Sequence, residues 1–273
     1  MKKLIVVSDW VQDSMSCQEY RTTVEGFLKE PSYVPVTFVS SAPSTIHTSF
    51  LLNQVIETEE RFGRPQETVV FQNTDPRFEK EEENNTVKGA EFLILRLKTG
   101  IFVCGPNAEY DFSLIKNKIE ELYHYQSIHH ETQFRSRDIY ARICAHLMDE
   151  MEDELELEEG PSDIIPELRG YFVGHIDCYG NIKTTITRES LKGKYESDDI
   201  ITITINNVKR KARFVNGLFS GKLGELIIYP GSSGSKDNPY LEISVWTHFK
   251  DKDYMTGEYF FNKPKVGSDI HLV

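Results

Sequence analysis

The chain has 273 residues, of which 39% are hydrophobic and 27% charged. A chain of this length and composition can bury a hydrophobic core and form two domains, so disorder throughout the chain is excluded. Its formal net charge of -12 opposes binding to polyanions, so we expect a small cation or zwitterion as ligand and no nucleic-acid partner. No window approaches the ~20 consecutive apolar residues of a membrane helix, and the first apolar run is short, so we expect a cytoplasmic protein without a leader or a membrane partner.

The N-terminal half alternates strand-like and helix-like patterns. Residues 4–7 predict a buried strand that ends at Ser8-Asp9 and places a carboxylate at the edge where open α/β sheets bind ligands. Further strands are predicted at 36–39, 69–72, 92–97 and 101–104, and helices at 49–61 and 113–125. This alternation predicts an α/β domain.

A further helix is predicted from Asp138, because Ile139, Ile143 and Leu147 recur every four positions. The chain then enters an acidic tract, residues 149–159, with eight acids and no base. We interpret the tract as a solvated helix end, followed by a linker over 161–168.

The pattern changes after Arg169 to short runs of branched and aromatic residues. Strands are predicted at 171–176, 182–186, 200–205, 213–215, 226–229 and 241–246, with turns at 179–181, 206–207 and 231–234. We therefore predict an α/β domain over residues 1–160 and an all-β, barrel-like domain over 169–273.

Common cofactor and metal patterns are not found. No Gly-x-Gly-x-x-Gly follows a strand, and the adjacent His129 and His130 are more typical of a surface loop than of a metal site. The cysteines are widely separated and form no Cys-x-x-Cys pair, which predicts free, mostly buried thiols at Cys17, Cys104, Cys144 and Cys178.

Five short motifs occur in a distinctive order. They are Ser8-Asp9, Gly105-Pro106-Asn107, Phe-Arg-Ser-Arg-Asp-Ile-Tyr-Ala at 134–141, Asp-Cys-Tyr-Gly-Asn at 177–181, and Ser-Ser-Gly at 232–234 followed by Leu-Glu-Ile at 241–243. In this order they resemble the S-adenosyl-L-methionine hydroxide adenosyltransferase family, which is similar in fold and mechanism to the fluorinase and chlorinase that use S-adenosylmethionine (SAM). Typical members show Thr-Asp-Phe-Gly, Gly-Pro-Asp-Asn-Gly, Phe-His-Gly-Arg-Asp-Phe-Ala, Asp-x-Phe-Gly-Asn and Ser-x-Gly-x-Leu-Glu-Ile. The resemblance spans nearly the whole chain.

The resemblance implies an α/β domain, a C-terminal β-barrel and a homotrimer whose ligand lies between the first domain of one subunit and the second domain of its neighbour. It implies that water displaces methionine from C5′ of SAM, releasing adenosine and L-methionine. SAM would be the substrate, with no cofactor and no metal besides it.

The family motifs imply a set of substrate-binding residues. Asp9 would accept hydrogen bonds from the ribose hydroxyls, and Asn107 would line the site. Asp177 and Asn181 would hold the methionine amino end and the nucleoside, and Ser232 the methionine carboxylate. Two plainer roles stay open: Asp9 as a cap, and residues 177–181 as a simple hairpin turn.

The chain departs from the family around the attacking water. Arg135 and Ser136 replace the His and Gly of Phe-His-Gly-Arg-Asp, and Asn73 falls on the Asp of Val-Asp-Pro-Gly-Val-Gly unless two residues are inserted to align Asp75. Arginine and asparagine cannot accept a proton, so Arg135 or Arg77 would act by stabilising hydroxide or another anion. Ser136 either contacts a halide, as a serine does in the fluorinase, or caps the helix that follows.

Three hypotheses follow for the set Asn73, Arg77, Arg135 and Ser136. The first is a divergent SAM hydrolase that uses these residues for catalysis. The second is a non-catalytic binder of SAM or adenosine. The third is a SAM-dependent halide transferase, which rests on Ser136 alone.

Overall fold

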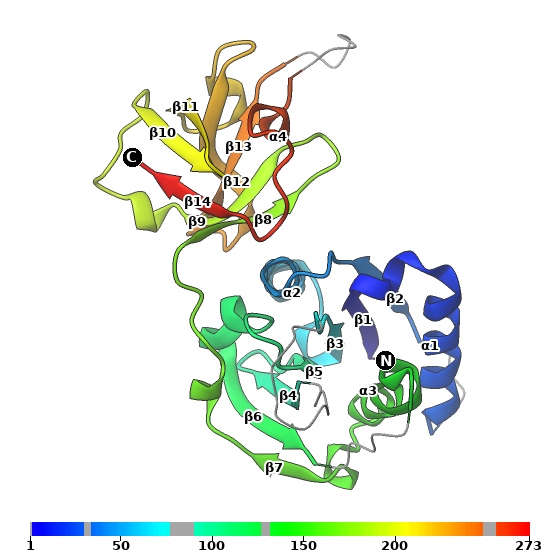
Figure 1. Cartoon of the computed structure of the whole chain (residues 1–273). Helices are drawn as coiled ribbons and strands as arrows, with labels where there is room; N and C mark the ends of the chain where they lie inside the picture. The colour runs from blue at the N-terminus through cyan, green and yellow to red at the C-terminus, as the bar shows by residue number, and fades with distance from the viewer. Residues whose placement is uncertain (1, 30–33, 77–89, 127–131, 248–254) are drawn as a thin grey trace, which may run out of the picture. The chain divides into compact units, whose positions relative to one another are not determined.

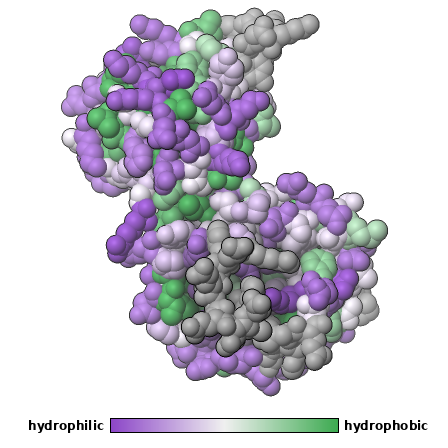
Figure 2. Space-filling view, in the orientation of Figure 1, coloured by the Kyte–Doolittle hydropathy of each residue, from purple (hydrophilic) through white to green (hydrophobic). Residues whose placement is uncertain are grey.

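The computed structural model describes residues 2–29, 34–76, 90–126, 132–247 and 255–273 (Figure 1). The chain divides into two compact units, Met1–Leu168 and Arg169–Val273. In the described ranges, no helix combines the length and the apolar composition that a membrane crossing requires. On the face drawn in Figure 2, hydrophilic side chains dominate each unit, with smaller hydrophobic groups between them.

The first unit is built on a seven-stranded sheet with the order β2-β1-β3-β5-β4-β6-β7. Its strands are β1 (Lys3–Ser8), β2 (Val36–Ser40), β3 (Thr68–Asn73), β4 (Phe92–Leu97), β5 (Phe102–Pro106), β6 (Ile119–Tyr125) and β7 (Leu157–Glu159). The strands β2, β1, β3 and β5 pair in parallel, whereas β4, β6 and β7 join them antiparallel. The four parallel strands therefore end at one edge of the sheet.

Helices cover both faces of this sheet. They are α1 (Ser14–Phe27), α2 (Thr45–Phe62) and α3 (Ala141–Met148), and a π-helical turn, Ser136–Tyr140, leads into α3. The short 3-10 segments are Asp9–Gln12, Pro65–Glu67, Ser113–Lys118, Glu152–Glu154 and Ser162–Ile164. Because successive strand residues point to opposite faces, Leu4 and Val6 join the core under α1 and α3, whereas Ile5 and Val7 join the core under α2.

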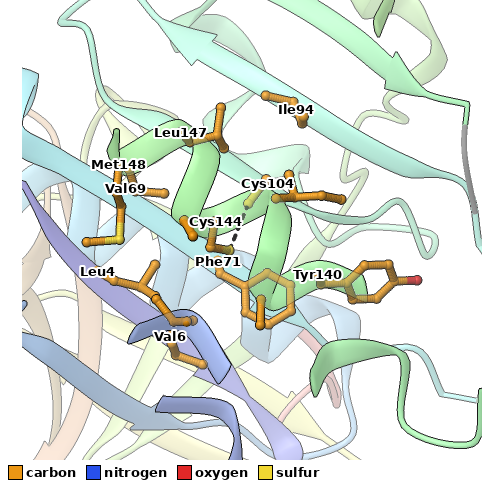
Figure 3. Packing of buried hydrophobic residues seen from close by; sticks show 14 of the residues in the cluster. Leu4, Val6, Val69, Phe71, Ile94, Cys104, Tyr140, Cys144, Leu147 and Met148 are labelled. Carbon is orange, nitrogen blue, oxygen red and sulfur yellow. Dashed lines mark hydrogen bonds between the residues drawn. The ribbon is translucent and has the colours of Figure 1, made fainter. Parts of the chain in front are cut away.

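Figure 3 shows the core under α3, where strand side chains such as Val69 and Phe71 pack against Tyr140, Cys144 and Leu147. Burying each large aliphatic side chain stabilises the fold by about 1.5–3 kcal/mol. The sulfurs of Cys104 and Cys144 lie 3.7 Å apart in this core, and both are free thiols. The other two cysteines are free as predicted but less buried than expected, since Cys17 is half-buried and Cys178 exposed.

The second unit is a closed barrel with the order β10-β11-β12-β13-β9-β8-β14. Its strands are β8 (Tyr171–Ile176), β9 (Ile182–Thr187), β10 (Ile200–Ile205), β11 (Val208–Phe214), β12 (Leu226–Gly234), β13 (Pro239–Val245) and β14 (Asp269–Leu272). The 3-10 segments Glu189–Leu191 and Leu218–Ser220 and the helix α4 (Gly257–Phe260) lie between strands. The mixed α/β content of the chain and its β-rich C-terminal part agree with the prediction.

The predicted turn at Asn206-Asn207 is confirmed. Both residues have positive φ, 47° and 66°, and join β10 to β11 as a two-residue hairpin. Asparagine tolerates this left-handed conformation, which matches the twist of paired strands.

Two predictions in the first unit are wrong. The predicted helix at 113–125 is a 3-10 segment followed by β6, because Ile119–Tyr125 pairs with β4 on one side and β7 on the other. The end of the acidic tract, predicted as a solvated helix end, is the strand Leu157–Glu159. Pairing with neighbouring strands overrides the helical spacing in the first case and the interpretation from acidic composition in the second.

The predicted turn at 231–234 also differs, because it lies inside the long strand β12. The register between β12 and β13 shifts between Pro230 and Gly234, as in a β-bulge. Residues 231–234 are therefore the last part of β12, where the pairing with β13 shifts register, rather than a turn after the strand.

Candidate functional site

The carboxyl edge of the parallel strands collects several of the predicted site residues. Ser8 and Asn73 lie opposite each other in the β1–β3 register, and the Ser8 hydroxyl donates to the Asn73 carbonyl at 2.5 Å. Asp9 follows β1 directly, and Asn107 follows β5. Three separate segments therefore bring Asp9, Asn73 and Asn107 to the edge where open α/β sheets bind ligands.

Asp9 is half-buried at the start of the turn after β1. Burial raises the pKa of Asp9, the nearby charge of Asp75 adds to this, and the Ser8 hydroxyl, 3.4 Å from Oδ1, opposes it. The N-cap of α1 is Asp13, which accepts hydrogen bonds from the backbone of Met15 and Ser16. Capping of α1 therefore does not involve Asp9.

Asn73 and Ser136 contact each other, although they are far apart in the sequence. The Asn73 amide Nδ2 donates a short hydrogen bond to the Ser136 hydroxyl, which is buried. One of the two predicted roles of Ser136, a cap of the helix, is wrong. The residue at the N-cap position is Arg135, and no side chain caps the helix there. The Ser136 oxygen instead accepts from the end of β3.

Arg135 faces the hydroxyl group of Tyr140 at the same edge. Burial raises the pKa of Tyr140, the Arg135 guanidinium opposes this rise, and the charge of Asp75 adds to it. Asp75 thus lies near both Asp9 and Tyr140. Arg77, the other predicted arginine, lies outside the described residues.

A third carboxyl group, Asp111, belongs to this cluster and was not predicted. Its side chain is completely buried on the segment after β5, and neither carboxyl oxygen has a hydrogen-bond partner among the described atoms. Burial raises the pKa of Asp111 well above its ordinary value, and the charges of Asp75 and Asp9 add to the shift, whereas the Ala108 N–H and the Gln72 side chain oppose it. No motif marks Asp111 in the sequence, because its burial arises from packing.

Polar side chains hold the strand ends in place. Gln72 donates to the Pro106 carbonyl at 2.5 Å and accepts from the Thr74 backbone at 3.0 Å, which joins β3 to β5. The Thr74 hydroxyl also contacts Ser41 at 3.0 Å and Thr48 at 2.7 Å. Such a buried, connected network fixes the positions of Asn73 and its neighbours.

In the second unit, Asp177 and Asn181 form a compact turn. Asp177 Oδ1 accepts from the backbone of Tyr179 at 2.9 Å and of Asn181 at 3.0 Å, and Oδ2 accepts from Asn181 Nδ2 at 3.0 Å. Asn181 in turn accepts from the Ser244 hydroxyl. The turn-forming role, left open by the sequence, accounts for these bonds.

Ser232 is bound to Glu242, a residue whose role was not predicted. The buried Glu242 Oε1 accepts from Ser232 N at 2.9 Å, Ser232 Oγ at 3.1 Å and Lys183 Nζ at 2.7 Å. Tyr229 donates to the other oxygen at 3.1 Å, and burial together with the Glu242 charge raises the pKa of Tyr229. The Leu-Glu-Ile motif contained Glu242, but only the fold shows its partners.

In the described part of the chain, no group of three or more His, Cys, Asp or Glu residues is placed to hold a metal ion. The two groups of predicted residues belong to different units. Asp9, Asn73, Asn107, Arg135 and Ser136 lie in the first, and Asp177, Asn181 and Ser232 in the second.

No protein-family model matches the sequence, and no curated protein matches it. Two solved structures share its fold. An uncharacterized conserved protein from Thermotoga maritima is 18% identical with a TM-score of 0.71, and the match covers 99% of this chain and 100% of that one. A conserved hypothetical protein from Thermus thermophilus is 16% identical with a TM-score of 0.64 over 100% of both chains. At such low identity, the likeness shows the shared fold alone.

Proposed function

We propose that the protein is a SAM hydrolase, a member of the hydroxide adenosyltransferase family, that releases adenosine and L-methionine. The observation that carries the proposal is the convergence of Asp9, the Asn73–Ser136 pair and Arg135 at the carboxyl edge of the parallel strands. These residues come from three distant segments, at positions that match the family motifs.

Asp9 would bind the ribose of SAM. A carboxylate has two oxygens with several lone pairs, so it can accept from the 2′ and 3′ hydroxyls together. Asp9 is half-buried, and hydrogen bonds to a partly desolvated carboxylate are stronger than those in bulk water.

Arg135, Asn73 and Ser136 would surround the attacking water. The water gives up one proton to bulk solvent, and the resulting hydroxide oxygen forms the bond to C5′ while the C5′–S bond breaks. The electron pair of the broken C5′–S bond stays on sulfur and neutralises the sulfonium. The leaving thioether is neutral, so no general acid is needed. The Arg135 cation would stabilise the hydroxide, and the partly buried Asn73–Ser136 pair would hold it in line with the C5′–S bond.

The barrel residues would complete the site from a neighbouring subunit of a cytoplasmic homotrimer. Asp177 Oδ2 accepts a single turn bond, so it keeps acceptor capacity that suits the methionine ammonium. Lys183, 3.3 Å from the Ser232 hydroxyl, would add the positive charge that binds the methionine carboxylate.

The test is incubation of the purified protein with SAM, followed by mass spectrometry for adenosine and methionine. We expect Asp9→Ala to lower kcat/KM by about a hundredfold or more, because the ribose loses its carboxylate acceptor. The matched control is Asp13→Ala, which removes a nearby exposed cap and should leave kcat/KM within about threefold. The proposed site also needs a neighbouring subunit, so analytical ultracentrifugation should show that the protein is a trimer.

Two other outcomes would replace this function. Saturable SAM binding by calorimetry without any product would favour the non-catalytic binder, which Asn73 and Arg135 support because neither can accept a proton. A 5′-chloro nucleoside formed only in the presence of chloride would favour the halide transferase. Ser136 supports that reading, since its hydroxyl accepts from Asn73 and can donate its own proton to an anion.

A further inference from the structure

The segment after β5 carries three buried acceptor atoms without donors. They are Oδ1 of Asn107 and both carboxyl oxygens of Asp111, none of which has a hydrogen-bond partner among the described atoms. Asp111 is completely shielded from solvent. Buried polar atoms are nearly always hydrogen-bonded, so this local excess of acceptors needs an explanation.

Among the described residues, the groups that act on Asp111 do not supply a positive charge. The charged groups acting on it are the carboxylates Asp75 and Asp9, and the polar groups are the Ala108 N–H and the Gln72 side chain. Gln72 already donates to Pro106. The described arginine of this cluster, Arg135, acts on Tyr140.

A single proton on Asp111 accounts both for the acceptors without partners and for the missing positive charge. Protonation turns one Asp111 oxygen into a hydrogen-bond donor beside other acceptors without partners, and it removes an unpaired buried charge. A proton also needs no space, in contrast to a metal ion or an ammonium group. The enclosed position of Asp111 is therefore suited to a neutral carboxylic acid.

We propose that Asp111 holds a proton at neutral pH and is a positioning residue that limits the negative charge around Asp9, so that Asp9 binds its ligand as a carboxylate. This role rests on the proposed function for its effect on SAM, but the proton on Asp111 is a property of the protein alone. An ionised Asp111 would add to the negative charge of Asp9 and Asp75, which already acts on it, whereas a neutral Asp111 adds none.

The first test measures stability against pH for the wild type and Asp111→Asn, which imitates a neutral acid. An acid that stays protonated only in the folded state contributes stability that is present below its unfolded pKa, about 4, and is lost as the pH rises. We expect the unfolding equilibrium constant of the wild type to rise relative to Asp111→Asn by about tenfold per pH unit above pH 4.

The control for this measurement is Asp163→Asn, which neutralises an exposed aspartate of the same unit. The difference in stability between this variant and the wild type should change little over about pH 5 to 8, the range of the unfolding measurements. An equally flat difference for Asp111→Asn would overturn the proposal.

The second test is infrared spectroscopy of the ligand-free wild type at neutral pH. We expect a carbonyl band from a protonated carboxyl group that shifts on ¹³C-labelling of aspartate and is missing in Asp111→Asn. The labelled wild type decides the question even if the variant does not fold, because absence of the band excludes a protonated aspartate.

The third test separates this inference from the proposed function. Calorimetry with SAM across the pH range should show binding by the wild type that weakens at alkaline pH, and Asp111→Asn should lose this weakening. Absence of SAM binding at every pH would contradict the proposed function while leaving the infrared and stability results valid. Binding whose alkaline weakening persists in Asp111→Asn would contradict the positioning role.

Discussion

At the scale of single residues, the barrel unit shows how a buried carboxylate is satisfied. Glu242 has 6% of its side chain exposed and accepts hydrogen bonds from Lys183, Ser232 and Tyr229. Asp111 in the first unit has the opposite environment, with burial but no hydrogen-bond partner for either carboxyl oxygen among the described atoms. The two residues show that burial alone does not decide the charge of a carboxyl group, because the available donors differ.

The Lys183–Glu242 pair leads to a prediction about stability. Glu242→Gln should lower the free energy of unfolding by about 3 kcal/mol, because it leaves the Lys183 ammonium partly buried without its counter-charge. The matched control is Glu189→Gln, whose partner Lys192 is exposed, and it should cost less than about 1 kcal/mol. Urea unfolding of the two variants measures the difference. Equal losses of stability would show that the buried pair contributes no more than the exposed pair.

At the scale of secondary-structure elements, the site depends on close contact between strand ends. Gly105 in β5 has φ +154°, and a Cβ there would overlap the Gln72 carbonyl oxygen of β3. Only glycine lets these two strands approach and lets Gln72 reach Pro106.

A pair of glycine variants tests this contact. Gly105→Ala should destabilise the protein by about 2–4 kcal/mol, because the backbone must shift where the candidate site is formed. Gly26→Ala, in α1 with open space around it, should stabilise by about 0.5–1 kcal/mol through the higher helix propensity of alanine. Thermal and urea unfolding of both variants measure the predicted loss and the predicted gain of stability. An unchanged stability of Gly105→Ala would mean that the strand ends can move apart without cost.

At the scale of the whole molecule, each unit has its own hydrophobic core. The barrel core contains residues such as Ile203, Ile228 and Ile243, and the clusters of the first unit are formed by other residues. A closed barrel also leaves no unpaired sheet edge. These properties are those of a domain that folds independently.

We therefore expect residues 169–273 to fold when expressed alone. The isolated barrel should give a dispersed amide NMR spectrum and one cooperative thermal transition. Ile243→Ala should lower the stability of this fragment by about 2–5 kcal/mol, because it opens a cavity in the core. A fragment with collapsed amide dispersion would show that the barrel needs the first unit.

Strands and turns with local signals can be predicted from the amino-acid order. Residues 92–97 and 200–205 were predicted with the bounds that β4 and β10 have, because runs of branched apolar residues report burial directly. The same holds for Asn206-Asn207, whose turn depends on the φ that asparagine tolerates. The family motifs also selected Asp9, Asn73 and Ser136 as candidates before any geometry was known.

Features that depend on distant partners become visible in the folded chain alone. Strand β7 exists because it pairs with β6, and its acidic sequence shows no strand pattern of its own. Asp111 has an ordinary sequence context, and its buried state without a described partner arises from residues that the fold brings around it. Pairing and desolvation are properties of several chain segments together, so no local pattern encodes them.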